Sequence, residues 1–215
     1  LESTAVHIAS TANDRAGALS IDERGGVFVA GIFCEVGTQC EAALPASSAF
    51  ESQVTLGDAF VLHYQADGVI DDAVLLSSIN PDGIERGVSA SFVGMLQDDA
   101  WVVAGQFCRG PQGDCSLELG EGATVERSTA LRAGAGSFVA KYRGARDVAW
   151  FHSVVGSGFA NFVAGDTDGL ETVVGGNFCD DSLDADSSFS CDVTLGGEPM
   201  TSRRNGDGLI ARFDG

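Results

Sequence analysis

The chain has 215 residues, with 31 acidic and 12 basic side chains and a formal net charge of −19 at pH 7. This charge argues against nucleic-acid binding, which needs basic side chains to neutralise phosphates, and against anionic membrane surfaces. No apolar run approaches the ~20 residues that span a bilayer, so membrane insertion is not expected. The acidity fits a well-solvated surface; a saline habitat or divalent-cation binding are the alternatives.

Three copies of the motif Gly-x-Phe-Cys organise the chain. They begin at Gly31, Gly105 and Gly176. Their spacing of about 70 residues predicts one supersecondary unit used three times. In each unit a weakly apolar first segment and a polar turn come before the strongest strand signal, a valine-rich run with an internal glycine. A strand glycine usually marks a bulge or the close approach of another backbone. These runs are Val27–Phe33, Trp101–Phe107 and Thr172–Phe178.

Two further strand segments follow the cysteine loop and a Leu-Gly pair in each unit. The third segments are Ala59–Tyr64, Ser137–Tyr142 and Gly208–Phe213. The fourth segments are Ala73–Ser77 and Val148–His152, and their third counterpart is Ala5–Ala9 at the N-terminus. No helical periodicity is present, and glycine is frequent.

Four strands per unit, joined by Gly and Asp turns, predict an all-β fold of β-propeller-like repeats. We expect a single repeat domain over residues 1–215 with three four-stranded blades, in which the N-terminal strand completes the last blade and removes an exposed sheet edge. The expected blades are residues 11–79, 89–155, and 159–215 together with 1–10.

These residues resemble the bacterial β-propeller repeats often called SBBP-type. The best match is the second unit, with its valine-rich run ending at Phe107, the Leu119-Gly120 pair, the Ser137–Tyr142 strand and Trp150. The resemblance covers nearly the whole chain and implies a propeller architecture without naming an activity. The cysteine pair in each unit is an addition to the family pattern, and Trp150 has no tryptophan counterpart in the other units.

Three blades are fewer than the about four to eight of typical propellers. We therefore expect the chain to be a segment of a longer array, or to form a six-bladed ring with a second chain, or to stack its units in a non-ring arrangement. The expected partners are other copies of the chain or neighbouring repeats of a longer protein. Phe28, Trp101 and Val173 are expected to occupy one shared position and to be buried between sheets.

The six cysteines fall as one pair per unit: Cys34 and Cys40, Cys108 and Cys115, Cys179 and Cys191. Each pair brackets the same loop, which favours three local disulfides over reduced thiols or a metal site. Such bridges require an oxidising compartment. The expected location is therefore secreted, periplasmic or at the cell surface.

Three aspartates in the third cysteine loop, Asp180, Asp184 and Asp186, form a candidate calcium site. Ca²⁺ takes about six to eight oxygen ligands, and alternating aspartates supply several from one loop. The EF-hand pattern is absent and the other two cysteine loops lack the acids, so a solvated insertion is the alternative. No other cofactor is expected.

The sequence identifies no catalytic residue. Its three histidines are scattered, and no serine has the frame of a nucleophile elbow. Aromatic side chains at fixed repeat positions favour packing between blades over sugar stacking. We therefore expect a structural or binding scaffold and no enzyme. The alternatives are a carbohydrate-binding propeller, with glycans as partners, and an enzyme with its site on a propeller face.

Overall fold

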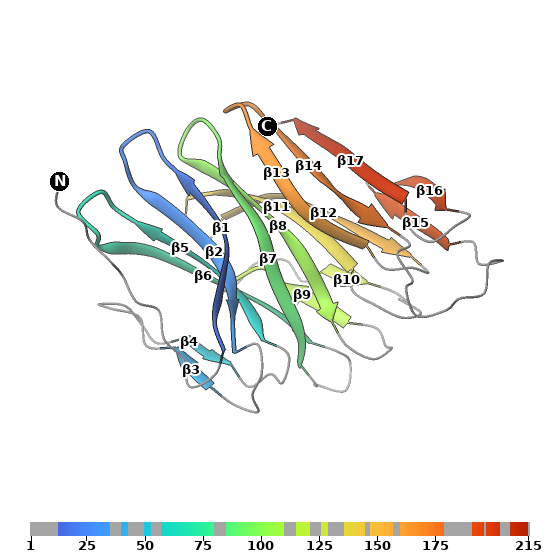
Figure 1. Cartoon of the computed structure of the whole chain (residues 1–215), viewed down its shortest axis with the longest axis horizontal. Coiled ribbons are helices and arrows are strands. Elements are labelled where there is room, and N and C mark those ends of the chain that lie inside the picture. Colours follow the sequence, from blue (N-terminus) through green and yellow to red (C-terminus); the bar gives the residue numbers. More distant parts are fainter. Residues whose placement is uncertain are drawn as a thin grey trace.

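The computed structural model is all-β, as expected (Figure 1). It contains seventeen strands and no helix in the described part of the chain. Within that part, no helix is long and apolar enough to span a membrane. The described residues are 13–34, 40–42, 50–52, 57–79, 85–109, 115–120, 126–128, 136–144, 147–156, 160–178, 191–195, 197–202 and 207–214.

Eleven of the strands form three antiparallel meanders, which we call the first, second and third sheets. The first sheet is β1 (Arg15–Ile21), β2 (Val27–Phe33), β5 (Asp58–Tyr64) and β6 (Ile70–Ile79). The second is β7 (Glu85–Met95), β8 (Ala100–Arg109), β11 (Gly136–Arg143) and β12 (Asp147–Gly156). The third is β13 (Ala160–Thr167), β14 (Glu171–Phe178) and β17 (Asp207–Asp214).

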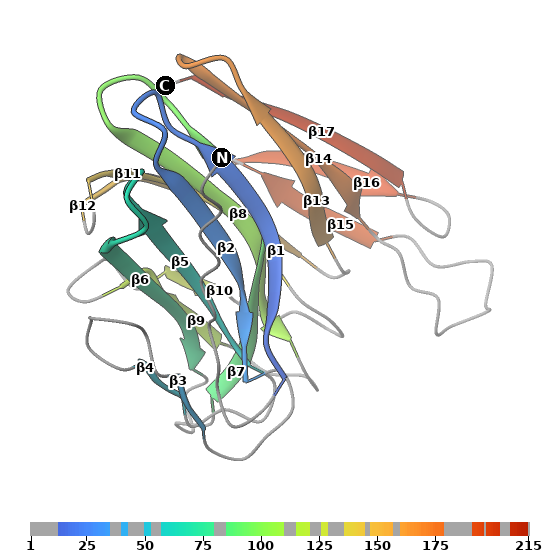
Figure 2. The same cartoon turned by 60° about the vertical axis from the view of Figure 1, so that its left-hand side comes forward.

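Three short hairpins follow the second strands of the sheets. They are β3 (Cys40–Ala42) with β4 (Phe50–Ser52), β9 (Cys115–Glu118) with β10 (Glu126–Ser128), and β15 (Cys191–Leu195) with β16 (Glu198–Ser202). Short pairings at strand ends join β6 to β7 and to β9, and join β12 to β15. Figures 1 and 2 show that the turns joining the first two strands of each sheet gather at one end of the molecule.

The glycine of Gly-x-Phe-Cys is required by a bulge that recurs in the first strand of each sheet. The pairing register shifts by one residue in β1, β7 and β13. A Cβ atom on the motif glycine would collide with a backbone carbonyl of that strand in all three units, at Arg15, Ser89 and Asn161. The predicted close backbone approach is therefore confirmed.

The last two motif residues turn the chain out of the sheet. Phe33 and Phe107 are buried, and the cysteines that follow them, Cys34 and Cys108, have φ values of 63° and 61°. This left-handed backbone is uncommon outside glycine. It bends the chain at the same place in both units, although β2 ends at Phe33 whereas β8 continues to Arg109.

The sheets are stacked face to face, and side chains that alternate along each strand fill the two cores between them. In the first core, Phe28 and Val61 of the first sheet pack with Trp101, Phe138 and Tyr142 of the second sheet. In the second core, the opposite face of the second sheet packs on the third. Its main members are Val102, Ala104, Val139 and Val154 against Phe162, Val174, Leu209, Ala211 and Phe213.

The expected equivalence of Phe28 and Trp101 is wrong by one residue. Trp101 pairs with Tyr142 just as Val27 pairs with Tyr64, so Trp101 matches Val27 and not Phe28. Because neighbouring residues of a strand point to opposite faces, Trp101 faces the first sheet, whereas Phe28 faces the second. The two rings therefore meet across the core, with centroids 5.7 Å apart.

A second expectation is wrong for the third unit. Val173 does match Phe28 in register, but 40% of its surface is exposed, because the outward face of the third sheet is not covered by another sheet of the described structure. Val173 faces away from the second sheet, as Val102 on the second sheet faces away from the first. The repeat pattern therefore predicts the correct face for the Val173 side chain. That side chain is exposed because no described sheet packs on this face.

The buried pair Trp101 and Tyr142 is the centre of the first core. The rings stack at 4.1 Å with an angle of 3° between their planes. The Trp101 indole donates to the Gly144 carbonyl at 2.9 Å, and the Tyr142 hydroxyl donates to the Leu119 carbonyl at 3.1 Å. Both polar atoms are thus satisfied within a buried site. Burial raises the pKa of Tyr142 well above its ordinary value of 10.0.

The raised pKa of Tyr142 predicts a loss of stability in alkali. Below pH 10 neither state ionises, so stability is unaffected; above it the unfolded chain releases the phenolic proton while the folded chain holds it. The free energy of unfolding should therefore fall as pH rises beyond about 10. Denaturant titrations from pH 8 to 11 measure this. Tyr142→Phe should cost about 1 kcal/mol at pH 8 through its lost hydrogen bond and should flatten the alkaline slope.

Tyr64→Phe is the matched control, because the chain has two tyrosines and burial also raises the pKa of Tyr64. Its effect on the alkaline slope should be smaller, since the rise is larger at Tyr142. An unchanged slope in Tyr142→Phe would contradict the assignment.

Candidate functional site

A histidine between two carboxylates links the β1–β2 turn to the start of β6 in the first sheet. His63 Nε2 lies 3.0 Å from Asp22 Oδ2, and His63 Nδ1 lies 2.6 Å from Asp71 Oδ1. Both ring nitrogens can donate at once only in the protonated imidazole. The ring also stacks on Phe28 with centroids 4.2 Å apart. Both ring nitrogens and the ring face of His63 therefore have partners inside the chain.

Asp22 is the anchor of this cluster. Its Oδ1 accepts hydrogen bonds from the backbone N–H groups of Arg24 and Gly26 at 2.8 and 2.6 Å. Partial burial acts to raise the pKa of Asp22, but the hydrogen bonds from His63, Gly26 and Arg24 together outweigh it and lower the pKa below 3.8. Asp22 is therefore ionised at neutral pH. The local role of this clasp of His63 with Asp22 and Asp71 is to hold the β1–β2 turn closed.

A basic side chain recurs at the His63 position. His63, Lys141 and Arg212 pair with matching residues of the preceding strand in the three sheets. Arg212 contacts Glu171 and lies 3.9 Å from Asp214. Lys141 instead lines a groove of about 500 Å³ between the second and third sheets, with Arg143 and the acids Asp98, Glu171 and Asp214. Both signs of charge line this groove, so it selects no single ligand class.

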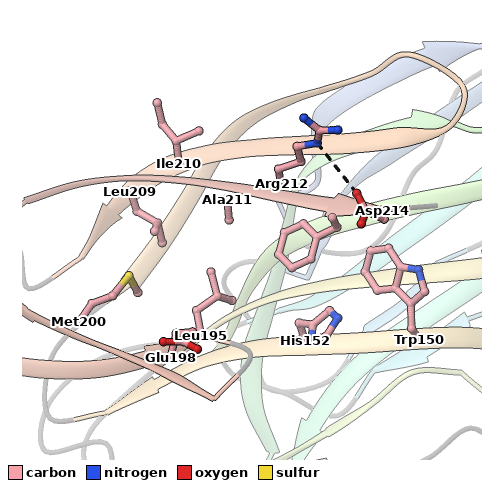
Figure 3. A pocket seen from close by; sticks show the side chains of 11 residues that line it. Trp150, His152, Leu195, Glu198, Met200, Leu209, Ile210, Ala211, Arg212 and Asp214 are labelled. Atoms are coloured by element: carbon pink, nitrogen blue, oxygen red, sulfur yellow. Dashed lines mark ion pairs between the residues drawn. The ribbon is translucent and has the colours of Figure 1, made fainter.

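A second pocket has an aromatic wall and lies beside the edge of β17 that pairs with no described strand (Figure 3). Its volume is about 570 Å³, and β12, the β15–β16 hairpin and β17 form its walls. Trp150 and His152 project from β12 toward β17 (Figure 3). The Phe213 ring lies 5.5 Å from Trp150 and 5.2 Å from His152, so three rings form one wall. Leu195, Met200, Glu198 and residues 209–214 complete the lining.

Two features of this pocket suit a ligand or a protein segment. The indole N–H of Trp150 is buried and has no acceptor among the described residues, and an unmet donor of this kind is rare. All of residues 209–214 on β17 line the pocket. Among the described strands β17 pairs with β14 alone, so its other edge faces this space. The pocket can therefore take a flat ring against the aromatic wall, or a strand along the edge.

The structure separates the aromatic residues that the sequence treats alike. Trp101 and Tyr142 are buried between sheets, which confirms the packing interpretation for these two. Trp150 is partly exposed and lines the pocket. The sequence signal for this difference is that Trp150 lacks a tryptophan counterpart in the other units. No sequence signal identifies the approach of His63 to Asp22 and Asp71, because it depends on the β1–β2 turn meeting the start of β6.

The remaining candidates lie largely outside the described residues. Asp180, Asp184 and Asp186 do so entirely. Within the described ranges, no group of three or more His, Cys, Asp or Glu side chains is placed to hold a metal ion. The calcium site stays a prediction.

The cysteine pairing also stays a prediction. Cys34 and Cys108 are buried and are not free thiols. The side chains of their expected partners Cys40 and Cys115, and those of Cys179 and Cys191, are outside the described part of the structure.

Peptide mapping without reducing agent should recover Cys34–Cys40, Cys108–Cys115 and Cys179–Cys191. Free thiols or bridges between units would contradict the pairing.

Comparison with known proteins adds no family. A scan against models of protein families finds no match, and a search of curated proteins finds none either. The likeness to SBBP-type repeats therefore rests on the repeated residues themselves, and the function has to come from the geometry of this chain.

Proposed function

We propose that this chain is a structural and binding scaffold of β-propeller type, secreted or held at a cell surface as part of a larger assembly. The observation that supports this proposal is that the residues that recur in every unit pack the sheets together. The motif glycines fit the bulges, the motif phenylalanines are buried, and the alternating strand residues fill two inter-sheet cores. Repeats of this kind build extended surfaces, and the segments that vary between units carry recognition.

The N-terminal segment supplies the fourth strand of the third sheet in this proposal. β5 pairs with β6 and β11 pairs with β12, whereas β17 has no strand on its second side among the described residues. The segment Ala5–Ala9 lies outside the described residues and has the composition of the fourth strands. Pairing it with β17 removes an open edge, which otherwise invites aggregation.

Deleting residues 1–10 tests this closure. The melting temperature should fall by several degrees, because the strand's hydrogen bonds and apolar contacts are lost, and the shortened protein should aggregate through β17. Replacing Val6 and Ile8 by serine is the matched control, since it keeps the backbone bonds and removes only the apolar contacts. A deletion variant with unchanged melting temperature and solubility would rule the closure out.

A carbohydrate-binding role is the second candidate, and the pocket of Figure 3 favours it. Sugars pack their apolar faces on aromatic rings, while neighbouring polar groups accept and donate hydrogen bonds. Trp150 provides the ring and an unmet donor, and Glu198 and Arg212 provide polar groups at the lining. The same space serves the closing strand, so the two roles compete for it.

Glycan binding is measured directly by screening the intact protein against oligosaccharides and titrating any that bind. Binding should fall at least tenfold in Trp150→Ala, since stacking on the ring and the indole donor are both lost. Trp150→Phe should retain part of it, because it keeps a ring without the N–H. If no oligosaccharide binds, or if Trp150→Ala binds equally well, the lectin role is excluded.

A further inference from the structure

The exposed apolar side chains of the described residues concentrate on the two end faces of the stack. The first and third sheets lie at opposite ends with the second between them (Figure 1). Five of the exposed large hydrophobics lie on strands at these ends, and the other two, Val69 and Leu170, lie in turns. The five are Leu19 and Ile21 on β1, Val163 on β13, Val173 on β14 and Ile210 on β17.

The exposed residues of the third sheet sit at positions that are core in the other two sheets. Val173 matches Phe28 and Val102, which fill the two cores. Ile210 is 81% exposed, and it matches Val61 and Val139, which also lie in those cores. At these two positions the third sheet thus carries the apolar side chains that contact the following sheet in the other two units.

The bulge position repeats the same relation. A Cβ atom on Gly17 in the first sheet would collide with the Ala90 carbonyl of the second, and Ser91 donates to the Phe162 carbonyl of the third. Each bulge therefore touches the next sheet along the stack. Val163, the third bulge residue, has no such neighbour among the described residues and is 56% exposed.

The first sheet carries the complementary half of this contact. Leu19 matches Val93 and Ile21 matches Met95 in pairing register. Val93 is buried in the core that the second sheet forms with the first, and Met95 packs against that core. On β1 the equivalent side chains are 69% and 65% exposed, because no sheet of the described structure packs against them.

The strand geometry of the internal contacts shows how the two ends fit. β7 lies against β1, β2 and β5 of the preceding sheet, and β13 lies against β7, β8 and β11. By the same rule β1 belongs against β13, β14 and β17, and Val173 on β14 and Ile210 on β17 are exposed there. The rest of the first sheet's outer face, around Phe33, Phe60 and Leu62, is already buried in the single chain. The contact at this end is therefore made through β1.

We propose that a second copy of this chain docks head to tail, with β1 of one copy on β14 and β17 of the other, and that two copies close into a ring of six sheets. The proposal rests on the propeller-type architecture proposed above. Two copies give six sheets, which lies within the about four to eight of closed propellers. The contact joins unlike surfaces, so it either closes into a ring or continues as a filament. The charge of −19 on each copy opposes association, so added salt should strengthen it.

The test is the mass of the full-length protein in solution, measured by sedimentation at 0.15 and 0.5 M salt. The wild-type particle should weigh twice the 22.1 kDa of one chain. Ile210→Asp and Ile21→Asp should each leave a monomer, because each places a charge in the apolar contact. Val69→Asp is the matched control: Val69 is 51% exposed but lies in the β5–β6 turn, off both faces, and this variant should remain a dimer.

A mixing experiment decides the direction of docking. In an equimolar mixture of the two monomeric variants, a mixed pair keeps one intact contact, so dimers should reappear. If identical third sheets met each other instead, Ile21→Asp would dimerise alone, and the proposal would be wrong. A wild-type monomer at all concentrations, or an assembly that grows beyond two copies, would also overturn it. All substituted residues are exposed, and circular dichroism checks that each variant is folded.

These outcomes are separable from failure of the propeller architecture. That architecture is tested by deleting residues 1–10. A destabilised deletion variant together with a wild-type monomer would leave the architecture standing and refute the dimer alone.

Discussion

The stacking of the aromatic face of one sheet on the apolar face of the preceding sheet is the interaction on which this structure depends. At its centre the stacked rings of Trp101 and Tyr142 pack against Phe28 of the first sheet. Burying large rings contributes several kcal/mol at each such contact. Each core between sheets is filled by side chains from both of them, so a single sheet cannot form such a core by itself. Stability therefore comes from contacts between units, and each unit needs neighbours.

This constraint explains where the polar chemistry is found. Both faces of the second sheet are used for packing, so charged groups are left at the ends of strands and in turns. The clasp of His63 with Asp22 and Asp71, and the pairing of Arg212 with Glu171, lie at the turn end of their sheets. These pairs fix turns within an acidic protein, and their partially exposed setting makes each worth about 1 kcal/mol or less. They shape the surface more than they stabilise the fold.

The ends of the stack are where packing is incomplete, and both proposed functions are located there. The aromatic pocket beside β17, the edge of that strand without a described partner, and the exposed faces of β1, β14 and β17 all lie where the described stack has no further strand or sheet. A strand, a glycan or a second copy would each use surface that internal units bury. The three are physically distinct occupants, because the strand needs backbone pairing, the glycan needs the Trp150 ring, and the copy needs an apolar face.

The sequence alone was enough for the all-β class and the position of the valine-rich and third strands, because alternating apolar residues and turn residues are local signals. The sequence also predicted the close approach of another backbone at the motif glycine. Glycine weakens the interior of a strand, so its presence there indicates that another backbone comes close. Sequence alignment of the repeats gives wrong equivalences where it disagrees with the hydrogen-bonded pairing of the strands. Trp101 was matched to Phe28, one residue out of phase. Val148 was matched to Ala73, although Val148 pairs with Tyr142 as Ile70 pairs with Tyr64.

Only the tertiary structure decided which face each residue occupies and whether that face is covered. A one-residue shift along a strand moves a side chain to the opposite face, so small alignment errors reverse the assignment of a core. Exposure of Val173 and Ile210 depends on the number of sheets in the stack, which no local pattern encodes. The meeting of His63 with two aspartates, and of Trp150 with Phe213, depends on how turns and neighbouring sheets approach each other in space. The composition of the repeat determined that sheets would stack, and the geometry of the stack determined which of its surfaces remain available.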